Sequence, residues 1–134
     1  MGTWGPGTFE NDHALDWWGD LREGSPSLAR EVLESVANAA PDADLDADDC
    51  CEALVAAEFV AAAVGRGIDR LPSEEAEAWL EEHGAALEYL ALARTAVERI
   101  ESRSELQELW DEGGRDEDWH ANVAELRSRL AEAS

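Results

Sequence analysis

Glu58 is the residue with the clearest potential for chemistry in this sequence of 134 residues, because it is a lone charge in an apolar segment. Residues 53–64 are otherwise Ala, Leu, Val and Phe. A buried carboxylate with a raised pKa can serve as a general base or a metal ligand. It can also be structural, accepting hydrogen bonds from backbone N–H groups of the Gly-rich N-terminus, from an indole N–H or from an arginine. Between these roles and plain exposure to solvent, we favour the structural one.

We expect Glu58 to hold a structured Gly/Pro-rich loop, residues 1–10, against the central apolar helix. The glycines of this loop permit backbone conformations with positive φ. The motif that begins in the loop and continues into the first helix consists of Trp4, Gly5, Gly7, Phe9, Asn11 and Asp12.

Replacing Glu58 with glutamine is expected to lower the free energy of unfolding by about 1 to 3 kcal/mol, the usual cost of leaving buried polar groups without a partner. Thermal unfolding of the purified variant measures the effect. An unchanged midpoint would contradict the structural role.

Asp12, His13 and Asp16 form the second candidate group, on the first turns of the predicted first helix. Their spacings of three and four residues let all three face one point, so they are weak candidates for holding a divalent cation. Asn11 and Asp12 are also explained by helix capping, because an Asn N-cap and an acid in the first turn both stabilise a helix start. We favour capping and predict no metal and no cofactor.

The acidic connector, residues 42–49, has the D-x-D-x-D spacing of the first half of a calcium loop. An EF-hand needs glycine at the sixth position and a bidentate glutamate at the twelfth, where this chain has Ala47 and Ala53. A true EF-hand is therefore excluded, and a solvated loop that caps the next helix is favoured.

Nucleophilic catalysis has little support. Cys50 and Cys51 are adjacent and are expected to be reduced thiols, while His83 and His120 stand alone near helix ends. No serine lies in a G-x-S-x-G turn. Whether the protein is an enzyme is uncertain, and the sequence favours a non-enzyme.

Six tryptophans are present, and most of them fall on helical stripes that are typical of a core. Trp17 points away from Trp18, because neighbours in a helix lie about 100° apart. We therefore expect Trp17 to be an exposed contact residue. A Trp-lined pocket for a small molecule is the alternative function for this set.

The elements that must position these residues are all helical. Apolar periodicity and capping residues predict an all-α fold of six or seven helices packed around a central buried helix. We expect one domain over residues 1–134, with a helical core over 11–132. The predicted helices span roughly residues 11–21, 26–40, 47–64, 72–84, 85–101, 104–112 and 116–132.

The last of these helices has an apolar stripe and a charged face. The stripe consists of Trp119, Val123, Leu126 and Leu130. The other face, expected to be solvated, carries Glu125, Arg127, Arg129 and Glu132.

Charge is the strongest feature of the composition: 32 acidic residues against 10 basic ones give a formal charge of −22. Every basic residue is arginine. Such a surface repels nucleic acid and anionic membranes and attracts a basic protein or cations. The same composition is typical of a GC-rich or high-salt host. The N-terminus lacks a signal peptide and no run is long enough to span a bilayer, so we expect a cytoplasmic protein.

Four stretches of the chain are similar, in collinear order, to domain of unknown function family 4259, a family of small bacterial proteins. They are GTWGPGTFENDHALDW at residues 2–17, EALVAAEFV at 52–60, the segment from Leu71 to Trp79, and SELQELW at 104–110 continuing to Trp119. The resemblance implies no activity, ligand or catalytic residue.

We therefore expect a non-enzymatic accessory or protein-interaction domain with an acidic face for a basic partner. One alternative is an immunity protein or nucleic-acid mimic that blocks a basic toxin. Another is a small-molecule-binding or metal-dependent protein that uses Glu58 with Asp12, His13 and Asp16.

Overall fold

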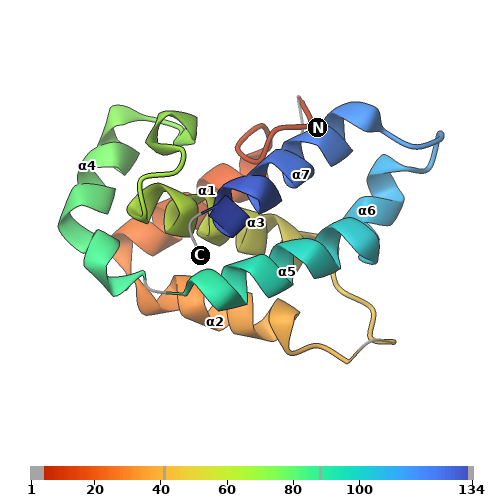
Figure 1. Ribbon diagram of the computed structural model, residues 1–134, viewed down its shortest axis with the longest axis horizontal. Helices are drawn as coiled ribbons and strands as arrows, with labels where there is room; N and C mark the ends of the chain where they lie inside the picture. Colours follow the sequence, from red (N-terminus) through yellow and green to blue (C-terminus); the bar gives the residue numbers. More distant parts are fainter. Residues whose placement is uncertain (1–4, 41, 88, 133–134) are drawn as a thin grey trace.

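The computed structural model describes residues 5–40, 42–87 and 89–132, so Trp4, expected in the N-terminal motif, lies outside the described residues. Within these ranges the chain forms α-helices and short 3-10 helices and no strand, which confirms the all-α prediction (Figure 1). The helices are α1 (Asp12–Glu23), α2 (Ser27–Ala37), α3 (Ala47–Ala63), α4 (Glu74–His83), α5 (Leu90–Ser102), α6 (Glu105–Trp110) and α7 (Glu117–Glu132). The 3-10 helices are η1 (Ile68–Arg70) and η2 (Gly84–Ala86).

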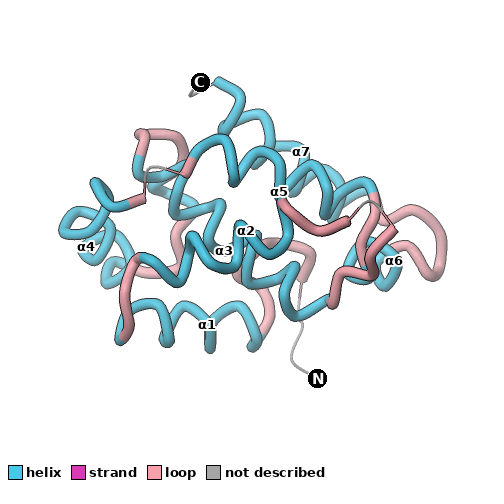
Figure 2. Tube along the Cα trace, turned by 90° about the horizontal axis from the view of Figure 1, so that it is seen from below, coloured by secondary structure: helices cyan, strands magenta, loops and turns pink. Residues whose placement is uncertain are grey.

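Helix α3 is the centre of the molecule. It begins where Asp46 accepts a hydrogen bond from the backbone N–H of Asp48, and it is followed by Gly65 with φ of 82°. Apolar residues cover it almost all round, and it packs against every other α-helix of the described chain. Helices α4 and α6 lie at opposite ends of the molecule (Figures 1 and 2).

Side-chain N-caps fix the starts of four other helices, and the first of these caps, Asn11, was predicted from the sequence. In each case the capping oxygen accepts a hydrogen bond from the backbone N–H three residues later. The caps are Asn11 for α1, Ser73 for α4, Ser104 for α6 and Asp116 for α7.

One expectation about a helix boundary is wrong. The fifth helix begins at Leu90 rather than near residue 85, because Gly84–Ala86 forms a separate 3-10 turn. Positive φ values, which the loop glycines permit, occur in the described chain at Gly65, Gly67 and Gly114 and are not used at Gly5 or Gly7.

The two loop glycines instead leave room for a carboxylate. The backbone N–H of Gly7 donates a hydrogen bond of 2.8 Å to Glu10 Oε1. A Cβ atom added to Gly5 or Gly7 would lie about 2.5 Å from that carboxylate group. The loop therefore wraps around the side chain of Glu10.

Trp17 is not an exposed contact: only 8% of its surface is accessible, and Trp18 is equally covered. The expectation failed because it assumed that two neighbouring rings cannot both be buried. Helix α1 buries a stripe wide enough to hold both, as amphipathic helices of globular proteins often do.

An aromatic cluster joins α1, α3 and α4 at one side of the core. Phe59 is fully buried and stacks on Trp18 with ring centroids 5.0 Å apart. Trp79 meets both rings edge-on, and Phe9 from the N-terminal loop meets Phe59 at 6.2 Å. The loop is thus attached to α3 by an apolar contact as well as by polar ones.

No helix in the described part of the chain is both long enough and apolar enough to cross a bilayer.

Candidate functional site

Glu58 lies on α3 with 3% of its surface exposed, and its carboxylate is held by two other segments. The hydroxyl of Thr8 donates a hydrogen bond of 2.9 Å to Oε2. The guanidinium of Arg129 lies 2.9 Å from Oε1. Asn122 Nδ2 in turn donates to the Thr8 hydroxyl at 3.1 Å, so the N-terminal loop, α3 and α7 meet at this carboxylate.

Arg129 is the residue that the sequence analysis misplaced. It was expected on the solvated face of the last helix, yet only 9% of it is exposed. Its Nε donates to Glu125 Oε2 at 2.7 Å and its Nη1 donates to the carbonyl of Arg66 at 3.2 Å. Arg129 therefore joins α7 both to α3 and to the turn that follows α3.

Gly67 makes room for this guanidinium. A Cβ at Gly67 would lie 2.3 Å from Arg129 Nη1, and the φ of Gly67 is 110°, which side chains disfavour. Two independent constraints therefore require glycine here. The sequence did contain a signal for the pair of Glu58 and Arg129. Arg129 lies next to the apolar stripe of the last helix, and Glu58 lies in an apolar segment without a nearby counterion.

The electrostatics fit a structural role for Glu58. Burial raises the pKa of its carboxyl above the ordinary value, while Arg129 and the Thr8 hydroxyl oppose that rise by favouring the charged form. The partners that surround the carboxylate also occupy the positions that a substrate proton or a metal ion would need.

The second candidate group is dispersed. His13 Nε2 lies 2.8 Å from Glu52 Oε2 on α3, whereas Asp12 and Asp16 are exposed. No three His, Cys, Asp or Glu side chains among the described residues are arranged to hold a metal ion. Glu58 and His13 also line different cavities, so the structure does not bring them together.

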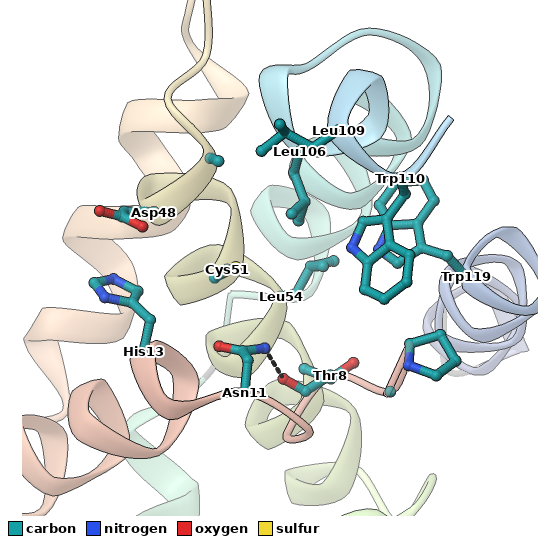
Figure 3. A pocket seen from close by; sticks show the side chains of 13 residues that line it. Thr8, Asn11, His13, Asp48, Cys51, Leu54, Leu106, Leu109, Trp110 and Trp119 are labelled. Atoms are coloured by element: carbon teal, nitrogen blue, oxygen red, sulfur yellow. Dashed lines mark hydrogen bonds between the residues drawn. The ribbon is translucent and has the colours of Figure 1, made fainter. Parts of the chain in front are cut away.

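A groove of about 210 Å³ lies where the N-terminal loop, α3 and α6 meet (Figure 3). One wall is apolar and includes Leu106, Leu109, Trp110 and Trp119 from α6 and α7. The opposite wall is polar, with His13 from α1 and Asp48 from the first turn of α3. Thr8 and Asn11 close one end, and Gly7 also lines the groove, so two residues of the N-terminal motif, Gly7 and Asn11, help to shape it.

Cys51 also lines the groove, but its chemistry is not that of a nucleophile. Burial raises the pKa of the Cys51 thiol to about 12, with the neighbouring Cys50 as the next cause. Burial likewise raises the pKa of Cys50 to about 11. Both thiols are free and stay protonated at neutral pH, so neither supplies a reactive thiolate.

We expect both thiols to react slowly with a disulfide reagent in the folded protein. A pKa two to three units above the reference value lowers the thiolate fraction by on the order of a hundredfold to a thousandfold. The rate of reaction with Ellman's reagent near neutral pH measures this, with the urea-unfolded chain as the control. Equal rates in the folded and unfolded states would show that the thiols are exposed and that their pKa values are not raised.

His120 is the second residue that sequence reasoning missed, because the histidine expected to stand alone is buried among acids. Its Nε2 lies 2.9 Å from Asp111 Oδ2, and its Nδ1 lies 3.8 Å from Glu101. The side-chain amide of Gln107, the backbone N–H of Asp116 and His120 hold the pKa of Asp111 well below its ordinary value. The local signal in the sequence was the four-residue spacing of Gln107 and Asp111, which lets the Gln107 amide donate a hydrogen bond to the Asp111 carboxylate that His120 contacts.

The acidic connector and α6 together form an acidic surface at one end of the molecule. The backbone N–H of Glu105 donates to the Leu45 carbonyl at 3.0 Å, and that of Ala47 donates to Glu105 Oε1 at 3.2 Å. All the acids of this surface are exposed. They are Asp42, Asp44, Asp46, Asp48, Asp49, Glu105 and Glu108.

Comparison with known proteins adds a family and no activity. The family described as "Domain of unknown function (DUF4259)" matches residues 2–122, which leaves Arg129 beyond the matched segment. Neither the curated proteins nor the solved structures contain a match to the chain. The matched segment covers most of the chain, including the N-terminal motif, Glu58 and the groove, and the chain therefore belongs to the DUF4259 family.

Proposed function

We propose that this protein is a non-enzymatic interaction domain that binds a basic protein through its acidic surface. The observation that carries the proposal is the state of the carboxylates there. Among the described residues, none of the seven acids of the acidic surface takes part in an ion pair. Most of the cations that would neutralise them must therefore come from solution or from a partner.

The arginines of the chain are largely engaged elsewhere. Arg22, Arg30, Arg66, Arg115 and Arg127 each pair with a carboxylate outside the acidic surface. Arg103 lies near the surface, where it lines a small cavity with Asp44, Glu105 and Glu108. Arg99 is also close, because its guanidinium donates to the carbonyls of Ala39 and Ala43 at the connector. Two arginines among seven carboxylates still leave a strongly negative potential, which steers and orients a basic partner.

We further propose that the protein works in the cytoplasm. Two free, adjacent thiols are the state that a reducing compartment maintains, which supports this assignment.

The test compares two variants with the same loss of charge. The first neutralises the acidic surface with Asp42→Asn, Asp44→Asn, Asp49→Asn and Glu108→Gln. The second neutralises exposed or half-exposed acids of α4, at the opposite end, with Glu74→Gln, Glu77→Gln, Glu81→Gln and Glu82→Gln.

A fluorescein-labelled nine-residue arginine peptide serves as the probe, and fluorescence anisotropy gives its dissociation constant. The first variant is expected to bind about tenfold more weakly than the unmodified protein, since four exposed charge pairs contribute roughly 0.2 to 1 kcal/mol each. The α4 variant is expected to change the constant by less than about twofold, because α4 lies at the opposite end of the molecule from the acidic surface and salt screens exposed charges over about 8 Å. Equal losses in both variants would show that the acidic surface has no special role.

A further inference from the structure

The groove beside the acidic surface differs from it in character, because it offers an apolar wall as well as charge. Leu109 is 50% exposed, which makes it the most exposed of the large apolar side chains in the described chain. It stands at the rim of the groove, and Trp110 lies next to it, half-buried (Figure 3). Exposed apolar groups of this size beside a hollow are typical of a contact for a partner.

The size of the groove selects the kind of group that it can take. Pockets for cofactors and drug-sized ligands span roughly 300 to 1,000 Å³. This groove, at about 210 Å³, is smaller and suits one large side chain, such as leucine or phenylalanine. Its apolar wall then covers that side chain in the way that an anchor pocket covers a hot-spot residue.

The charges around the groove select the neighbours of that side chain. Asp48 lies in the polar wall, and the hydrogen-bonded pair of His13 and Glu52 lies beside it. No arginine lines the groove, and Asp48 also belongs to the acidic surface. A segment that enters the groove therefore passes carboxylates on one side and meets no fixed cation.

We propose that the groove binds one large apolar side chain of a partner segment in which that residue is flanked by arginine or lysine. The apolar residue packs against Leu109 and Trp110, and the flanking cations face Asp48 and the acidic surface. This inference rests on the proposed function, since it names the feature of the basic partner that the protein recognises.

The main competing occupant is a second copy of this chain. Its turn after α3 presents Ile68, 42% exposed, between Arg66 and Arg70, which has the proposed chemistry. Both arginines already face carboxylates of α7, Glu132 and Glu125. The formal charge of −22 also repels a second copy. A foreign segment is therefore favoured over self-association.

The test is a selection from a phage-displayed library of random twelve-residue peptides on the immobilised full-length protein. Each selected peptide is then synthesised and titrated against the unmodified protein and two variants. Leu109→Ser alters the groove, and Ile68→Ser is the matched control, an exposed apolar residue outside it. Both side chains are exposed, so both variants are expected to fold, and thermal unfolding checks this.

We expect the selected peptides to share one large apolar residue flanked by arginine or lysine. Their affinity is expected to fall at least about tenfold with Leu109→Ser and less than about twofold with Ile68→Ser, as for an anchor residue and a bystander. Replacing the apolar residue of the peptide with alanine is expected to cause a similar loss. Asp48→Asn is also expected to weaken binding, and this loss of affinity is expected to become larger as the salt concentration is lowered.

Any other result contradicts the groove inference. The results below also show whether the proposed function fails together with it. If basic peptides bound Leu109→Ser as tightly as the unmodified protein, the groove would be ruled out as the binding site and the acidic surface would remain. If the selected peptides had no net positive charge, both the groove inference and the proposed function would be ruled out. Tighter peptide binding by Trp4→Ala would identify the chain's own N-terminus as the occupant, and concentration-dependent dimers lost in Ile68→Ser would identify a second copy.

Discussion

Replacing Arg129 with methionine is expected to lower the free energy of unfolding by roughly 3 to 5 kcal/mol, the usual cost of removing one partner of a buried ion pair. Glu58, 3% exposed in the unmodified protein, would keep the Thr8 hydroxyl as its one other hydrogen-bond partner among the described residues. The cost is therefore that of a buried charge without its counterion. Urea unfolding followed by circular dichroism measures the effect.

The pH dependence of the Arg129→Met variant tests the cause. Without the cation, burial raises the pKa of Glu58 in the folded state well above its unfolded value. The folded state then binds a proton that the unfolded state has released, so stability is greatest below the unfolded pKa of about 4.3. We expect the destabilisation to grow as pH rises from about 4.5 toward neutrality, and to be partly relieved in acid.

Arg30→Met is the matched control. Arg30 pairs with Glu34, four residues away, as Arg129 pairs with Glu125, but Arg30 is exposed. This control is expected to cost less than about 0.5 kcal/mol. In the double variant Glu58→Gln with Arg129→Met, no buried charge remains, and much of the lost stability should return. If Arg129→Met cost no more than Arg30→Met, the buried pair would have no special importance.

Replacing Phe59 with alanine is expected to lower the free energy of unfolding by about 3 to 5 kcal/mol, the range for truncating a buried aromatic side chain. Phe59 is fully buried, and its ring contacts Phe9, Trp18 and Trp79 from three other segments. The cavity would lie beside α3, which packs against every other α-helix, so local collapse cannot easily fill it.

Urea unfolding gives the size of this effect, and near-ultraviolet circular dichroism reports the tryptophans. The signal of Trp18 and Trp79 should weaken, because both rings lose the face or edge against which they pack. Val64→Ala serves as the control, since Val64 follows the same helix and is 45% exposed. A loss below about 1.5 kcal/mol for Phe59→Ala would mean that the aromatic cluster repacks.

The helices were predictable because their signals are local. Capping side chains sit three residues from the N–H groups that they accept, so Ser73 and Ser104 mark helix starts in the sequence itself. The apolar segment around Glu58 likewise predicts a buried helix without knowledge of its neighbours. Where local signals are weak, as at residues 84–89, the predicted boundary was wrong.

The partners of buried polar groups were not predictable, because they come from distant parts of the chain. Arg129 lies beside the apolar stripe of α7, and only the packing of α7 on the turn after α3 turns it inward. His120 is buried for the same reason, since the stretch that ends α6 brings Asp111 to its ring. Periodicity assigns a residue to a face, and tertiary contacts decide what covers that face.

The groove was also beyond the sequence. Its walls come from the N-terminal loop, α1, α3, α6 and α7, and most of the residues that they contribute look like ordinary core or cap positions. Leu109 falls in a short predicted helix, and nothing local shows that half of its surface faces solvent.

The polar junction of Thr8, Glu58, Asn122 and Arg129 also has a consequence for synthesis on the ribosome. About 70 residues separate Glu58 from Arg129, so the carboxylate precedes its counterion by roughly 4 to 14 s at ordinary translation rates. Until α7 emerges, the Glu58 carboxylate lacks its counterion. A product terminated before α7 keeps a buried carboxylate without its counterion, which favours unfolding and, with it, degradation.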